Sequence, residues 1–126
     1  MTDADRPHLL LVDDEAITVM ALERFLGRKG FRVSVAANGQ EALTLAARDP
    51  PDLVVTDMRM PRLSGKDLIR RLRDDRPGLP VVVVTGYMAA DMETSGLDGP
   101  ETVVLTKPLD PEALIVTMNG LLGRKP

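Results

Sequence analysis

The sequence contains no cysteine and no tryptophan, and only one tyrosine and two phenylalanines among its 126 residues. The absence of cysteine excludes disulfide bonds and thiolate metal sites, and it fits a reducing compartment. The stretch between positions 59 and 73 is rich in Arg and Lys but contains no aromatic residue on which a nucleic-acid base could stack. We interpret these basic residues as a solvated helix face, which could also guide an acidic partner to the chain. The residues are Arg59, Arg62, Lys66, Arg70, Arg71 and Arg73.

The chain also lacks excess positive charge and a long apolar run. Its formal net charge is −3, so the chain as a whole lacks the excess positive charge that direct nucleic-acid binding requires. No apolar run approaches the roughly 18 residues that a bilayer requires, and the opening MTDADRP lacks the basic start and apolar centre of a signal peptide. We expect a cytoplasmic protein without membrane insertion, folded as a single domain over 1–126 with a core of about 8–123.

Short apolar runs alternate with segments of helical period along the whole chain. The predicted strands cover 9–12, 31–36, 53–56, 81–84 and 102–105, and a helix is predicted after each. Such a (βα)5 pattern implies parallel strands joined by right-handed crossovers. The expected fold is a flavodoxin-like α/β doubly wound three-layer sandwich with strand order 2-1-3-4-5. The strict apolar–polar alternation of 31–36 fits an edge strand, whereas the four valines of 81–84 fit an internal one.

Several predicted helices carry signals at their ends. Gly30 supplies a stop for the first helix, and Asn38 followed by Glu41 predicts a capping box for the second. Ser64 starts the third, the fourth at 88–94 is short, and Asp110 with Pro111 starts the last. The first helix is predicted from apolar residues at helical spacing, namely Ile17, Met20, Ala21 and Phe25.

Polar residues stand at the ends of four of the predicted strands, and the expected strand order puts them on one edge of the sheet. They are Asp13 and Asp14 after strand one, Asp57 after strand three, Thr85 after strand four and Lys107 after strand five. Three carboxylates within about 4–6 Å repel by on the order of 1 kcal/mol per pair in water, so they need a cation. Lys107 supplies one charge, and the oxygen ligands favour Mg²⁺ over zinc, with Mn²⁺ as an alternative. An aspartate beside such an ion can act as a nucleophile toward a phosphoryl group.

Four motifs together resemble the signature of a response-regulator receiver domain, of the kind found in two-component signalling and chemotaxis. They are the acidic pair in LLLVDDE, the aspartate in DMRMPRLSG, the threonine in VVVVTG and the lysine in VVLTKPL. Each motif alone is weak, but all four fall at the expected strand ends in the expected order. The resemblance covers about His8 to Gly123, nearly the whole chain.

The resemblance implies a role for each of these residues. Asp57 would be the phosphoacceptor, Asp14 a direct Mg²⁺ ligand and Asp13 a ligand through water, with the backbone carbonyl of Arg59 as a further ligand. Thr85 and Lys107 would contact the phosphoryl group, and the peptide between Lys107 and Pro108 would be cis. The implied partners are a histidine kinase or histidine phosphotransfer protein as donor and a downstream protein or fused effector as target; a homodimer is left open. The chain would act as a signalling switch that catalyses only its own phosphorylation and dephosphorylation.

Each residue also has a simpler structural interpretation. Asp13 and Asp14 could cap the helix that begins near Glu15, and Asp57 could be an ordinary polar loop residue. Thr85 beside Gly86 is common turn chemistry, and a lysine before proline is commonly solvated. Their joint occurrence in the right order favours the functional interpretation. His8, the single histidine, is expected to be an ordinary surface residue.

Three other functions fit the sequence less well. A nucleotide-binding domain would carry a glycine-rich turn after the first strand, where this chain has DDEAIT. A haloacid-dehalogenase-type phosphatase resembles the site but places a second aspartate two residues after the nucleophile, where this chain has Arg59. The remaining alternative is a pseudo-receiver, a protein-binding module that is not phosphorylated, and the complete set of acidic residues, Thr85 and Lys107 speaks against it.

Overall fold

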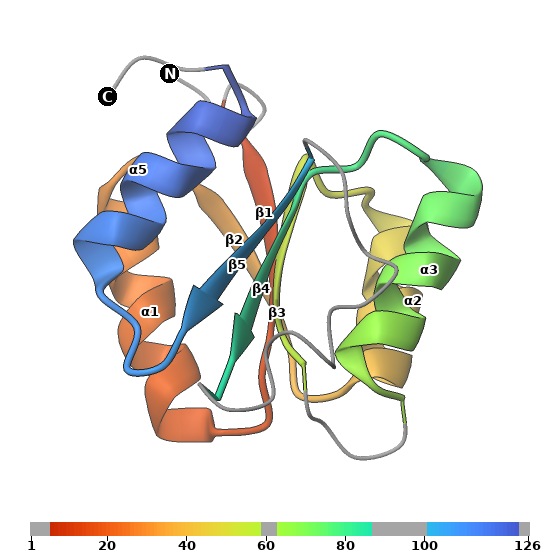
Figure 1. Cartoon of the computed structure of the whole chain (residues 1–126), viewed down its shortest axis with the longest axis horizontal. Helices are drawn as coiled ribbons and strands as arrows, with labels where there is room; N and C mark the ends of the chain where they lie inside the picture. The colour runs from red at the N-terminus through yellow and green to blue at the C-terminus, as the bar shows by residue number, and fades with distance from the viewer. Residues whose placement is uncertain (1–5, 59–62, 87–100, 124–126) are drawn as a thin grey trace.

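A computed structural model of the chain describes residues 6–58, 63–86 and 101–123 and shows a five-stranded sheet with helices on both faces (Figure 1). Neighbouring strands are parallel, and their order is β2-β1-β3-β4-β5. This confirms the predicted flavodoxin-like α/β fold, including the edge position of the second strand. The strands are β1 (His8–Val12), β2 (Arg32–Ala36), β3 (Leu53–Asp57), β4 (Val81–Thr85) and β5 (Thr102–Thr106).

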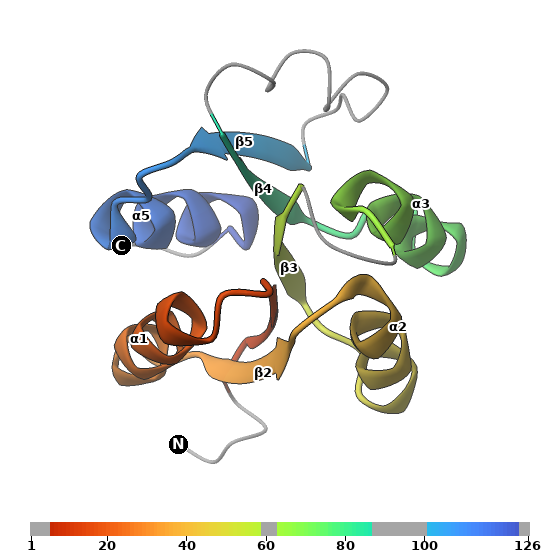
Figure 2. The ribbon, with the colours of Figure 1, turned by 90° about the horizontal axis from the view of Figure 1, so that it is seen from below.

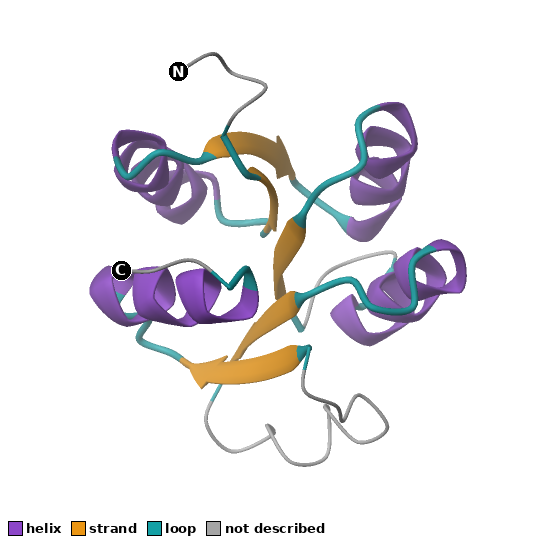
Figure 3. Cartoon of the chain, turned by 90° about the horizontal axis from the view of Figure 1, so that it is seen from above, coloured by secondary structure: helices purple, strands orange, loops and turns teal. Residues whose placement is uncertain are grey.

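Within the described residues, two helices cover each face of the sheet. Helices α1 (Ala16–Arg28) and α5 (Pro111–Leu121) lie on one face, and α2 (Gly39–Arg48) and α3 (Gly65–Asp75) lie on the other (Figure 2). Coloured by secondary structure, the same layers are seen from the opposite side in Figure 3. The predicted fourth helix, 88–94, falls outside the described residues. None of the helices in the described ranges is long and apolar enough to cross a membrane.

The predicted helix ends are confirmed by side-chain hydrogen bonds. Asn38 Oδ1 accepts the N–H of Glu41 at 2.9 Å, and Ser64 Oγ accepts the N–H of Asp67 at 3.2 Å. Asp110 Oδ1 caps the last helix by accepting the N–H of Glu112 at 3.0 Å. These bonds satisfy backbone donors that have no partner inside a helix, and they fix the residue at which each helix begins.

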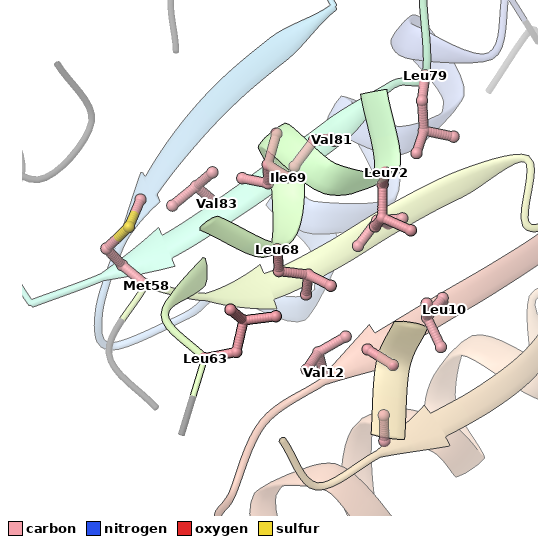
Figure 4. Packing of buried hydrophobic residues seen from close by; sticks show 13 residues of the cluster. Leu10, Val12, Met58, Leu63, Leu68, Ile69, Leu72, Leu79, Val81 and Val83 are labelled. Carbon is pink, nitrogen blue, oxygen red and sulfur yellow. The ribbon is translucent and has the colours of Figure 1, made fainter. Parts of the chain in front are cut away.

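The core consists of two apolar layers, one on each face of the sheet. Because successive strand residues point to opposite faces, Leu10 and Val12 of β1 face α2 and α3, whereas Leu9 and Leu11 face α1 and α5. Figure 4 shows the first layer, in which Leu68, Ile69 and Leu72 of α3 pack on the valines of β3 and β4. The central strands β1, β3 and β4 are buried along their whole length, which holds their carboxyl ends in fixed positions.

The first helix buries a face other than the one that carries Ile17 and Met20. Val19, Leu22 and Leu26 are buried against the sheet, whereas Ile17 is 85% exposed and Met20 is 54% exposed. Helix α1 carries two apolar stripes, and the sheet covers only one of them. The second stripe therefore leaves large apolar side chains on the surface.

Two polar residues also lie deeper than expected. His8 is buried in β1, where its Nε2 lies 2.7 Å from Ser34 Oγ and its Nδ1 lies 3.3 Å from the Pro50 carbonyl oxygen. The expectation of a surface histidine was wrong because these partners satisfy both ring nitrogens. Arg73 is half-buried and donates to the carbonyl oxygens of Leu79 and Glu101, so it does not belong to a solvated basic face. Burial lowers the pKa of its guanidinium.

Candidate functional site

The strand register brings the predicted site residues to one edge of the sheet. Val12 pairs with Thr56, Asp57 pairs with Val84, and Thr85 pairs with Thr106. Asp13, Asp57 and Lys107 therefore meet where the carboxyl ends of β1, β3 and β5 converge, and all three line one cavity. In doubly wound sheets this edge is where ligands bind, because loops and helix starts surround it.

Asp57 is the last residue of β3 and is only 7% exposed. Its Oδ2 accepts a hydrogen bond from Lys107 Nζ at 2.8 Å. A buried carboxylate requires such a charged partner, since burial without one is costly. The buried strand and the ion pair hold the Asp57 carboxylate at the inner end of the cavity.

Two further carboxylates lie beside Asp57. Asp13, Asp14 and Asp57 each offer an oxygen, and these oxygens all lie within 4.8 Å of one another. Asp13 is half-buried and accepts the N–H of Glu15 at 3.0 Å, whereas Asp14 is exposed. Burial raises the pKa of Asp13 most, and the neighbouring charge of Asp57 raises it further. A compact, oxygen-only donor set that carries several negative charges fits a hard divalent cation such as Mg²⁺.

Lys107 connects the site to the fifth strand. Besides its hydrogen bond to Asp57, its Nζ lies 3.9 Å from Glu15 Oε1. The hydrogen bond to Asp57 is the main reason that the pKa of Lys107 is raised. The backbone N–H of Lys107 donates to the Thr85 carbonyl oxygen at 2.9 Å, and the peptide between Lys107 and Pro108 is cis, as the resemblance implied.

Thr85 ends β4 and is 1% exposed. Its hydroxyl donates to the Gly86 carbonyl oxygen, with 3.4 Å between the oxygens, and the residue is not among those that line the cavity. The structure thus places Thr85 at the correct edge with its side chain turned toward its own loop. The remaining predicted site residue, Arg59, lies outside the described residues.

The cavity beside Asp57 has a volume of about 470 Å³ and extends over the start of α1. Sequence reasoning missed its apolar wall, formed by Ile17, Ala21 and Leu109, and it assigned no role to Glu15. Glu15 directly follows the acidic pair, so its position next to the site could have been inferred. The outward direction of Ile17 could not, because the apolar spacing of α1 fits both faces.

Comparison with known proteins identifies the family. Residues 9–119 match the family model described as response regulator receiver domain, and the chain belongs to this family of two-component response regulators. It is 40% identical over 116 residues to response regulator MprA of Mycolicibacterium vanbaalenii and 34% identical over 116 residues to the probable transcriptional regulatory protein TcrX of Mycobacterium tuberculosis. Each alignment covers 92% of this chain and 50% of the relative, so the chain spans about half the length of these relatives.

A solved structure supports the same assignment. The response regulator receiver domain protein from Clostridium thermocellum superposes with a TM-score of 0.85 at 27% identity, over 93% of this chain and 94% of that one. The agreement covers almost the whole of both chains, so the fold and the family assignment concern the same residues.

Proposed function

We propose that this receiver domain accepts a phosphoryl group from a partner's phosphohistidine onto Asp57 and changes conformation as a result. The observation that carries the proposal is the buried Asp57 carboxylate, with Lys107 Nζ 2.8 Å away and two further carboxylates within 4.8 Å. An aspartate with a purely structural role would need only the ion pair with Lys107. The added carboxylates make the site anionic enough to require a metal, and a metal in turn suits phosphate oxygens.

In the proposed reaction, an Asp57 carboxylate oxygen attacks the phosphorus of the phosphohistidine. A P–O bond to Asp57 forms while the P–N bond breaks, and the electron pair of that bond stays with the imidazole nitrogen of the partner. The product is an acyl phosphate. For the reverse half of the cycle, water attacks the phosphorus, the Asp57 carboxylate leaves, and inorganic phosphate is released.

Lys107 and Thr85 are proposed to hold the transferred group. Lys107 already reaches Asp57, so its ammonium can move from the carboxylate to a phosphoryl oxygen over a short distance. Thr85 is the last residue of the neighbouring strand β4. Its hydroxyl would supply a second donor once its loop turns inward. Donors aimed at developing charge in a partly buried site are worth more than the same donors in water.

Asp13, Asp14 and Asp57 would hold Mg²⁺, or Mn²⁺ in its place, with the Arg59 carbonyl as the proposed further protein ligand. When bound, the ion neutralises charge on the phosphoryl oxygens and on the attacking carboxylate. The fit rests on the donor set, which in the described residues consists of three carboxylates whose oxygens lie within 4.8 Å.

Phosphorylation is proposed to act as a switch. The new charge on Asp57 would draw Thr85 and its loop toward the site, favouring one of two conformations that already exchange. Thr85 and Lys107 are already linked through the Thr85 carbonyl and the Lys107 N–H at 2.9 Å, so a movement of one is transmitted to β5. Because the named relatives are about twice as long, we propose that the output passes to a fused effector or a separate protein.

The donor protein is proposed to dock over the cavity next to Asp57. A phosphohistidine has to enter this cavity, and Ile17 at its rim is 85% exposed and lies one helical turn from Met20, which is 54% exposed, so the rim carries an apolar patch suited to a protein partner. Ile17→Ser should slow transfer from a phosphorylated kinase or phosphotransfer protein while leaving labelling by acetyl phosphate intact. Val116, 63% exposed on α5, offers a matched control: Val116→Ser should change neither rate.

The proposed function is tested by incubating the chain with acetyl phosphate in the presence of Mg²⁺ and measuring the intact mass. A gain of one phosphoryl group that disappears when EDTA replaces Mg²⁺ supports the receiver reaction. The alternative, a pseudo-receiver that binds proteins without being phosphorylated, is not favoured by the gathered acidic residues and predicts no gain in mass under either condition.

A further inference from the structure

Glu15 stands at the opening of the cavity, at the N-cap position of α1. Its side chain makes no capping hydrogen bond and is 65% exposed. Its backbone N–H instead donates to Asp13 Oδ1 at 3.0 Å. The Glu15 carboxylate therefore caps no backbone N–H of the helix, and its Oε1 lies 3.9 Å from Lys107 Nζ.

Lys107 consequently faces two carboxylates from different parts of the chain. Asp57 holds its ammonium from the inner end of the cavity at 2.8 Å, and Glu15 attracts it from the opening at 3.9 Å. During phosphoryl transfer the ammonium has to move from Asp57 to the incoming group. A second anion competes with that group for the same cation, and the competition is modest because the pair is exposed.

We propose that Glu15 is a positioning residue that draws Lys107 toward the opening of the cavity and thereby slows phosphoryl uptake by Asp57. The inference rests on the proposed function, since it concerns the rate of that reaction. It assigns to Glu15 the task of limiting how readily Asp57 takes up a phosphoryl group.

The test measures the rate of labelling by acetyl phosphate with saturating Mg²⁺. Glu15→Gln removes the charge and keeps the size of the side chain, and it should raise the rate by roughly 1.4- to five-fold, the range for an exposed ion pair. The gain should shrink at high salt, which screens exposed charges. Glu15→Asp keeps the charge on a shorter side chain, so its rate should lie between those of the wild type and Glu15→Gln. The matched control is Glu23→Gln, the same change at an exposed position of the same helix, and it should have no effect.

A second donor separates an effect through Lys107 from simple repulsion of the donor. Phosphoramidate is protonated on nitrogen near neutral pH and carries less net negative charge than acetyl phosphate. An effect through Lys107 gives the same gain with both donors, whereas a gain that vanishes with phosphoramidate overturns the proposal. Equal rates for the wild type, Glu15→Gln and Glu23→Gln overturn it as well. A wild-type chain that takes up no phosphoryl group at all contradicts the proposed function itself, so the two failures are distinguishable.

Discussion

Gly65 lies directly against the backbone of Asp57. A Cβ placed on Gly65 would lie 2.5 Å from the Asp57 carbonyl oxygen and 3.0 Å from Met58 Cα. The Gly65 N–H also donates to the Met58 carbonyl oxygen at 2.9 Å. The first turn of α3 is thus packed on the strand end that carries the proposed phosphoacceptor, and only glycine permits this approach.

Gly65→Ala should therefore destabilise the chain and displace Asp57. The steric clash is expected to cost about 1–3 kcal/mol, which outweighs the gain of up to about 1 kcal/mol from helix propensity. Urea unfolding and the rate of labelling by acetyl phosphate measure both effects. Gly27→Ala in α1 is the matched control: nothing lies within 4 Å of its Cβ, so it should stabilise the chain and leave labelling unchanged.

Lys107→Ala removes the hydrogen-bond donor to Asp57 and leaves the three carboxylates in place. Metal binding should persist, because all the carboxylate ligands remain, while the rate of labelling should fall about 100-fold, the typical cost of losing a charge-stabilising donor. Titration with Mg²⁺ and labelling by acetyl phosphate are the two measurements. Loss of metal binding together with labelling would instead indicate that the substitution disrupts the whole site.

The interaction between Lys107 and Asp57 should make stability depend on alkaline pH. The pKa of Lys107 is raised above its ordinary value of 10.5, chiefly by the hydrogen bond to Asp57. A raised pKa in the folded state means that the stabilisation is complete below the unfolded pKa and is lost as pH rises through the folded pKa. The difference in unfolding free energy between wild type and Lys107→Ala, measured in urea without metal, should be constant at neutral pH and shrink above about pH 10.5. A difference that stays constant well above pH 10.5 would contradict the assignment.

His8 should contribute to stability and not to the reaction. It lies at the amino end of β1, and its ring bonds to Ser34 and to the Pro50 carbonyl at the edge of the sheet opposite Asp57. His8→Ala leaves a cavity and unsatisfied polar atoms, at a cost of about 2–3 kcal/mol. Thermal unfolding checks the loss, and labelling by acetyl phosphate should keep its rate under conditions where the variant is folded. Ser34→Ala removes one of the bonds and should cost less.

Strand order and the shared edge of the site residues could be predicted from the sequence. An apolar run such as the four valines of β4 is stable only as an internal strand of a sheet that helices cover on both faces. Short right-handed crossovers then allow only a few strand orders. The acidic residues that follow such runs then necessarily meet at the carboxyl edge. The helix ends at Asn38, Ser64 and Asp110 were equally predictable, because capping depends on residues close in sequence.

The positions that sequence reasoning left open or placed wrongly depend on the packing of the complete fold. Ile17 belongs to one of two apolar stripes on α1, and only the packed sheet decides which stripe is covered. His8 and Arg73 are polar, and their burial depends on carbonyl groups outside their own strand or helix, those of Pro50, Leu79 and Glu101. Such partners follow from the complete fold and leave no local pattern.

The account rests most directly on Asp57 as the residue that is phosphorylated. Wild type, Asp57→Asn and the control Asp74→Asn, an exposed residue of α3, are incubated with acetyl phosphate and Mg²⁺ and compared by intact mass and peptide mapping. We expect one phosphoryl group on the peptide containing Asp57 in the wild type and the control, and none on Asp57→Asn. Labelling of Asp57→Asn to the wild-type extent would contradict the account.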